Sequence, residues 1–110
     1  MDPVSDQLEA YNARDINRFV SYYDPEVAIE DGEGNTLMRG HDEMRTRYRA
    51  LFEVSPHLHC RLVSRIRVGN YVIDEEEVTG VKLEDAPELL HAVAIYRIER
   101  DKIAHVVILT

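Results

Sequence analysis

Apolar residues in the first half of the chain recur at the three- and four-residue spacing of amphipathic helices. A first helical segment is expected over residues 5–23 and is interrupted near Asn12–Asp15, where Asp15 is suited to cap a second short helix. Asp24–Pro25 then predicts a tight turn, because a residue before proline disfavours the helical conformation. A third helix is expected over residues 41–53, with one apolar face formed by Met44, Tyr48, Leu51 and Phe52.

The second half of the chain alternates apolar and polar residues, as half-buried strands do. A short strand is expected over residues 27–31, and residues 37–39 return beside it after a turn. Four long strands are expected over residues 58–68, 71–78, 90–98 and 103–109. Helices followed by a run of antiparallel strands predict an α+β fold, in which helices cover one face of a curved, partly mixed sheet.

Size and charge limit the classes of function. The chain has 110 residues, enough for one domain with its own core, and its formal net charge of −8 disfavours nucleic acids and anionic membranes as partners. No apolar run approaches the roughly 18 residues of a membrane span, and the acidic start of the sequence lacks the pattern of a secretory signal. Cys60 is the one cysteine, which excludes an internal disulfide, so a cytoplasmic location is expected.

The sequence resembles the nuclear transport factor 2-like superfamily, and within it the SnoaL-like and ketosteroid isomerase-like small proteins. The resemblance rests on the order of elements, on Asn12–Ile16, on Tyr23–Pro25 before Val27–Asp31, and on Arg39–Glu43 at the start of a helix. It spans residues 1–110 as a single domain. It implies a cone, in which a bent sheet wraps around an internal pocket closed by helices, and it implies frequent dimers. The superfamily contains enzymes of several kinds and proteins that only bind, so the fold leaves the function open.

The resemblance also suggests which residues would carry chemistry. Ketosteroid isomerases place a general-base aspartate at the end of the first strand, and the matching residue is Asp31. Their two acidic hydrogen-bond donors match positions near Gln7 and Ala94, so the oxyanion-binding pair is absent here. One hypothesis is therefore proton transfer of an isomerase, cyclase or dehydratase type with Asp31 as the base. The alternative is a non-catalytic domain for lipophilic ligands or dimer contact, in which Asp31 caps the turn Gly32–Gly34.

The long hairpin supplies further candidates. If Gly69–Asn70 is a two-residue turn, Arg65 lies opposite Asp74 and Val63 opposite Glu76, and opposed residues share a face. One face then carries His59, Arg61, Val63, Arg65, Asp74, Glu76 and Val78, and the other carries Leu58, Cys60, Leu62, Ile66, Val68, Tyr71 and Ile73. Hydropathy favours the second face as the core, whereas the resemblance places the face of Asp74, Glu76 and Val78 inside the cone. We expect an arrangement that satisfies both the hydropathy pattern and the resemblance. In it the cavity inside is lined by polar residues, and the apolar outer face contacts a second copy of the chain.

The residues expected to line the cavity are Tyr11, Tyr48, Phe52, His59, Arg65, Asp74, Glu76 and Ala94. The pairs Arg65–Asp74 and Arg61–Glu76 either polarise a ligand or are cross-strand ion pairs without chemistry. His59 and His91 either shuttle protons near neutral pH or are ordinary strand histidines. His57 and His59 share a strand face, but no spacing specifies a third ligand, so neither a metal nor a cofactor is expected. The expected partners are a small apolar or amphipathic molecule and a second copy of the chain, bound through the sheet face.

Overall fold

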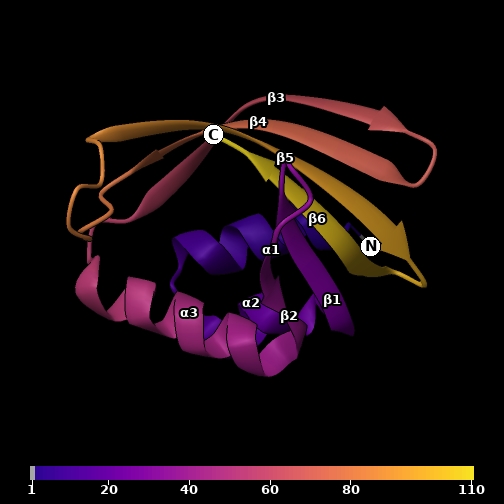
Figure 1. Cartoon of the computed structure of the whole chain (residues 1–110), viewed down its shortest axis with the longest axis horizontal. Coiled ribbons are helices and arrows are strands. Elements are labelled where there is room, and N and C mark those ends of the chain that lie inside the picture. Colours follow the sequence, from indigo (N-terminus) through magenta and orange to yellow (C-terminus); the bar gives the residue numbers. More distant parts are fainter. Residues whose placement is uncertain (1) are drawn as a thin grey trace.

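The computed structural model describes residues 2–110, which form three helices and a six-stranded sheet. The helices are α1 (Pro3–Asn12), α2 (Ile16–Ser21) and α3 (Gly40–Val54). The strands are β1 (Tyr23–Asp31), β2 (Thr36–Arg39), β3 (His59–Val68), β4 (Tyr71–Thr79), β5 (Leu89–Glu99) and β6 (Lys102–Leu109). All three helices lie on the same side of the curved sheet, and no helix covers its other face (Figure 1).

The sheet is mixed and open. Its strand order is β2-β1-β6-β5-β4-β3, with β1 parallel to β6 and the other neighbouring pairs antiparallel. A bent sheet whose concave side is filled by helices is the α+β cone that the sequence predicts. Within residues 2–110, every helix is too short or too polar to span a membrane.

Local sequence explains where the first two helices begin. Asp2 accepts hydrogen bonds from the backbone N–H groups of Val4 and Ser5 at 3.2 and 3.3 Å, and Asp15 accepts one from Arg18 at 3.2 Å. The predicted break between the helices is confirmed. Asp24–Pro25, however, lies within β1 rather than in a separate turn, at a place where the pairing with β6 is irregular. Proline is tolerated there because an irregular ladder does not need its missing N–H group.

The long hairpin follows the predicted register only part of the way. Pairing agrees with the prediction from Val68 opposite Tyr71 to Ser64 opposite Glu75, including Arg65 opposite Asp74. A β-bulge at Val63 then shifts the register, because the extra residue has no partner on β4. As a result, Leu62 lies opposite Glu76 and Arg61 opposite Glu77, so the predicted pairing of Arg61 with Glu76 is wrong.

The bulge also decides which side chains of β3 face the helices. Cys60 is buried on the same face as Glu76 and Val78, whereas His59 and Arg61 are exposed on the other face. The alternating residues Val72, Asp74, Glu76 and Val78 of β4 are all buried beneath the helices. The inward orientation suggested by the resemblance is therefore confirmed for β4, and the choice of core face from hydropathy is wrong there.

Candidate ligand cavity

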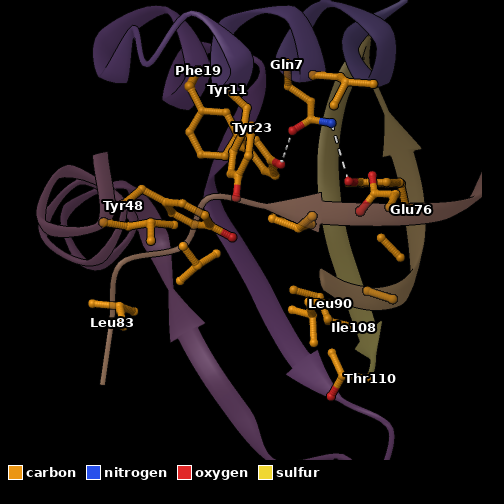
Figure 2. Close-up of a pocket in the computed structure, with 17 residues that line it drawn as sticks. Gln7, Tyr11, Phe19, Tyr23, Tyr48, Glu76, Leu83, Leu90, Ile108 and Thr110 are labelled. Carbon is orange, nitrogen blue, oxygen red and sulfur yellow. Dashed lines mark hydrogen bonds between the residues drawn. The ribbon is translucent and has the colours of Figure 1, made fainter. Parts of the chain in front are cut away.

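A cavity of about 280 Å³ lies between the helices and the concave face of the sheet (Figure 2). Most of its wall is apolar and includes Leu8 of α1, Leu51 of α3, Val78 of β4 and Leu90 of β5. Residues Val81 and Leu83, in the loop after β4, complete the wall. Leu83 is 53% exposed, which places it where the cavity meets solvent. The volume is close to the lower end of the range for ligand pockets, roughly 300–1,000 Å³.

Glu76 is the one acidic residue that the described part of the chain places in the cavity wall. Its position on β4, between Leu62 of β3 and Ala92 of β5, leaves only 8% of the residue exposed. Burial raises the pKa of Glu76 to about 7, and the nearby charge of Asp74 acts in the same direction. A hydrogen bond from Cys60, the positive charge of Arg65 and a hydrogen bond from Tyr96 act against this rise but do not cancel it. Glu76 is therefore a carboxyl group that both gains and loses a proton close to neutral pH.

Asp74 and Arg65 form a buried ion pair behind Glu76. Arg65 donates from Nε and Nη2 to the two carboxylate oxygens of Asp74, at 2.6 and 2.8 Å. Its Nη1 group donates to the hydroxyl oxygen of Ser5 on α1, at 2.5 Å. The Asp74 side chain is completely buried, and the Arg65 side chain is 16% exposed. The pair joins the hairpin to the first helix and lies outside the cavity wall.

Gln7 organises the hydroxyl groups next to Glu76. The Tyr23 hydroxyl donates to Gln7 Oε1 at 2.9 Å, and Gln7 Nε2 donates to the Tyr96 hydroxyl at 3.3 Å (Figure 2). Gln7 Nε2 also donates to the Val4 carbonyl at 3.0 Å. These bonds connect α1, β1 and β5 across the end of the cavity. Burial raises the pKa of Tyr23 and Tyr96 well above the ordinary value, so both phenols stay protonated.

Aromatic rings form a second part of the wall. Phe19 packs against Tyr48 with ring centroids 4.8 Å apart and against Tyr11 at 5.8 Å. Burial raises the pKa of Tyr48 to about 12 and that of Tyr11 further, so both remain neutral hydrogen-bonding groups. Figure 2 shows these rings on the side of the cavity opposite Glu76.

Asp31 lies outside the cavity. Its carboxylate accepts hydrogen bonds from the backbone N–H groups of Glu33 and Asn35, both at 2.9 Å, and from the Asn35 side chain at 3.0 Å. The Asn35 side chain and backbone are the main reasons that the pKa of Asp31 is lowered. The turn between β1 and β2 uses this carboxylate as a cap, so Asp31 does not reach a ligand in the cavity as the expected base would. This is the alternative that the sequence left open.

The other predicted site residues divide into two groups. Tyr11, Tyr48, Glu76 and Ala94 line the cavity. Phe52 packs behind the wall with its ring 5.4 Å from that of Tyr11, and Arg65 and Asp74 form the ion pair already described. His59 and His91 are exposed on the outer face, where His91 lies 2.7 Å from Glu75. Among residues 2–110, no three His, Cys, Asp or Glu side chains are grouped as metal ligands.

Sequence reasoning missed Gln7, Tyr23 and Tyr96 as lining residues. Tyr96 follows Ala94 by two residues on one strand and so shares its face. Gln7 precedes Tyr11 by one helical turn, which was a usable signal as well. Tyr23 was assigned to the end of a helix, and that assignment hid its role at the start of β1.

The open bent sheet, the helices on its concave side and the internal cavity define a nuclear transport factor 2-like fold. The family model of the SnoaL-like domain matches residues 4–106, and the chain belongs to this family. The comparison with curated proteins found no match.

Solved structures agree with this assignment. An uncharacterized cystatin fold protein from Novosphingobium aromaticivorans is 27% identical, with a TM-score of 0.89, covering 100% of this chain and 99% of that chain. A hypothetical protein with a ketosteroid isomerase-like fold from Catenulispora acidiphila was solved in complex with trimethylamine. It is 17% identical, with a TM-score of 0.79, and the match covers 96% of this chain and 82% of that chain. A SnoaL-like protein of unknown function from Burkholderia thailandensis is 15% identical, with a TM-score of 0.77, and the match covers 96% of this chain and 88% of that chain. The last two likenesses, at such low identity, show the fold alone.

Proposed function

We propose that the chain binds a small, mostly apolar molecule in its cavity and that Glu76 exchanges a proton with this molecule. The observation that carries the proposal is a nearly buried carboxyl group, with a pKa of about 7, in the wall of an otherwise largely apolar cavity. A catalytic acid or base is most effective when its pKa lies near the working pH. The proposal keeps proton-transfer chemistry and moves the base from Asp31 to Glu76.

Neutral phenols supply the hydrogen-bond donors. The two donor positions of ketosteroid isomerases match Gln7 and Ala94, and both residues line the cavity. Tyr11 and Tyr48 also line it and remain protonated, so either can donate to an oxygen atom of the ligand that gains negative charge. A hydrogen bond from Tyr96 acts to lower the pKa of Glu76 and so favours the ionised carboxylate.

The test uses 5-nitrobenzisoxazole, a small aromatic probe. A base removes the proton from its ring carbon, the N–O bond breaks, and the product is a coloured cyanophenolate. We expect the wild-type protein to accelerate this reaction, with a rate that rises through pH 7 and then levels off as Glu76 loses its proton. Glu76→Gln should lower the rate by about 100-fold or more.

Two variants serve as controls. Glu75→Gln changes the neighbouring residue, whose side chain bonds Ser64 and His91 on the outer face, and Asp31→Asn changes the turn cap. Both should retain the wild-type rate. A rate that survives Glu76→Gln, or one that is lost in Asp31→Asn, contradicts the proposal.

One observation favours a second candidate, a pocket that only binds. Within residues 2–110 every fully buried side-chain nitrogen or oxygen has a hydrogen-bond partner, so Gln7 and the hydroxyls of Tyr23 and Tyr96 at the end of the cavity are satisfied without a ligand. Native mass spectrometry of freshly purified protein distinguishes the two functions. An unmodified apolar molecule retained by the protein, together with no turnover of the probe, supports binding alone.

A further inference from the structure

We propose that the cavity prefers a protonated amine, a ligand with an apolar body and one ammonium group that pairs with Glu76. This inference rests on the proposed binding function and adds the chemical class of the ligand.

The balance of charge around Glu76 favours a cationic ligand. The connected group at this end of the molecule contains the carboxyl groups of Asp2 and Asp74 and the guanidinium groups of Arg65 and Arg67. Arg65 pairs with Asp74 at 2.6 Å and approaches Asp2 at 3.7 Å, and Arg67 pairs with Asp2 at 2.5 Å. These four charges balance each other. Glu76 lies beside them without a salt bridge to any cation of residues 2–110.

A buried carboxylate without a counter-ion is unfavourable, and proteins usually pair such charges. Among residues 2–110, no Lys, Arg or His side chain lines the cavity. An ammonium group on the ligand would therefore supply the cation that the protein does not. A carboxylate on the ligand would instead face Glu76 with nothing to compensate the repulsion.

The aromatic wall of the cavity also favours a cation. Tyr11, Phe19 and Tyr48 line the cavity across from Glu76 (Figure 2). The faces of such rings attract cations within about 6 Å of the ring centre. An ammonium group between the carboxyl group and the rings gains from both, while its hydrocarbon part contacts the apolar wall. The formal net charge of −8 also favours the approach of cations over anions.

The preference should depend on pH through Glu76. Around this carboxyl group lie Asp74 and Arg65, as an ion pair, together with the Cys60 thiol and the phenols of Tyr11, Tyr23, Tyr48 and Tyr96. Burial raises the pKa of the thiol and of the four phenols, so all five stay neutral between pH 6 and pH 8. An ammonium group favours the ionised carboxylate. Amine affinity should therefore rise from pH 6 to pH 8, whereas the affinity of a neutral ligand should not.

Isothermal titration calorimetry with three ligands of one shape provides the test. Benzylamine, benzyl alcohol and benzoate share one small ring and differ in charge. At pH 8 we expect benzylamine to bind about tenfold or more tightly than benzyl alcohol, and benzoate to bind more weakly than either. Glu76→Gln should remove the advantage of the amine and leave the affinity of the alcohol within about twofold, while Glu75→Gln should preserve the wild-type order.

A second measurement on the wild-type protein does not depend on the variant. At pH 6, titrations in buffers of different ionisation enthalpy should show that benzylamine releases most of one proton on binding and that benzyl alcohol releases none. Equal affinity of the amine and the alcohol, or no proton release by the amine, overturns the inference while the proposed binding function stands. Failure of all three ligands to bind, with an empty cavity by native mass spectrometry, overturns both.

Discussion

At the scale of single residues, Glu76 links the function of the site to its stability. The carboxyl group has a pKa of about 7 in the folded protein, against an ordinary value of 4.5. The folded state therefore favours the protonated form. The stability that this provides is fully present below pH 4.5, and it is lost as the pH rises through 7.

Glu76→Gln should therefore change stability in a pH-dependent way. At pH 8 the variant avoids the buried charge, and its free energy of unfolding should exceed that of the wild type by about 2–3 kcal/mol. At pH 4 the wild-type carboxyl group is neutral and the two proteins should agree closely. Urea unfolding at both pH values measures the difference. A gap of the same size at pH 4 and pH 8 contradicts the assigned pKa.

Asp74 acts on the site through Glu76. Its charge contributes to the raised pKa of Glu76, so Asp74→Asn should move the pH midpoint of probe turnover below that of the wild type. The variant should also lose stability, because it leaves the Arg65 guanidinium without its bidentate partner. A purely structural role would lower stability and leave the midpoint unchanged, which is the contradicting result. Glu75→Gln, on the outer face, should leave the midpoint in place.

At the scale of elements, the sequence predicted the order of the helices and strands and the turn that sets the hairpin register near Gly69–Asn70. Those features depend on periodicity and on local turn residues. The bulge at Val63 was not predictable in the same way. One unpaired residue moves every side chain on its N-terminal side of β3 to the opposite face of the sheet, and it leaves no periodic signal in the sequence.

Part of the site could be predicted from the same periodicity and turn residues. Glu76 and Ala94 could be located because strand alternation beyond the turn is regular on β4 and β5. The position of Asp31 stayed open between two roles, because the resemblance implies a base and the turn residues that follow, Glu33 and Asn35 among them, favour a cap. The Gln7–Tyr96 bond joins residues 89 positions apart, and no local pattern encodes such a contact.

Gly80 controls the start of the loop that carries Val81 and Leu83 to the cavity. Its φ is +79°, and an added Cβ would lie 2.2 Å from the carbonyl oxygen of His57. Gly80→Ala should lower the free energy of unfolding by about 2 kcal/mol or more, because it combines backbone strain with a clash against main chain.

The matched control for this prediction is Gly34→Ala. Its φ is +86°, but an added Cβ would meet nothing within 4 Å. The cost should be limited to backbone strain, at about 1 kcal/mol. If the two variants had equal unfolding midpoints in urea, the close approach of Gly80 to His57 would contribute nothing to the loss of stability, which contradicts the prediction.

At the scale of the whole molecule, the outer face of the sheet carries an apolar row. Ile66, Ile73, Ile95 and Val107 lie directly opposite one another across four strands. Ile66 is 58% exposed, and no helix of the described chain covers this face (Figure 1). On this face Arg61 pairs with Glu77, and His91 lies 2.7 Å from Glu75. An exposed apolar row of this kind is typical of a contact between copies of a chain.

We propose that this row is the contact of a homodimer. Sedimentation velocity should show a dimer at tens of micromolar, and Ile66→Glu should shift it toward monomer because the substitution buries a charge in the interface. Val54→Glu is the control, since Val54 is 47% exposed at the end of α3 on the opposite side of the sheet. A wild-type monomer, or the same shift in both variants, contradicts the proposed contact.

Proton exchange and amine binding at Glu76 both require a carboxyl group in the cavity that titrates near neutrality. The most direct measurement is the pH titration of side-chain carboxyl carbons by NMR in protein labelled with ¹³C-glutamate, with the Glu76 signal identified by its loss in Glu76→Gln. The expected midpoint for Glu76 is about 7. A midpoint near the ordinary value of 4.5 would show that this carboxyl group is not held in an apolar cavity, and the account of the site would be wrong.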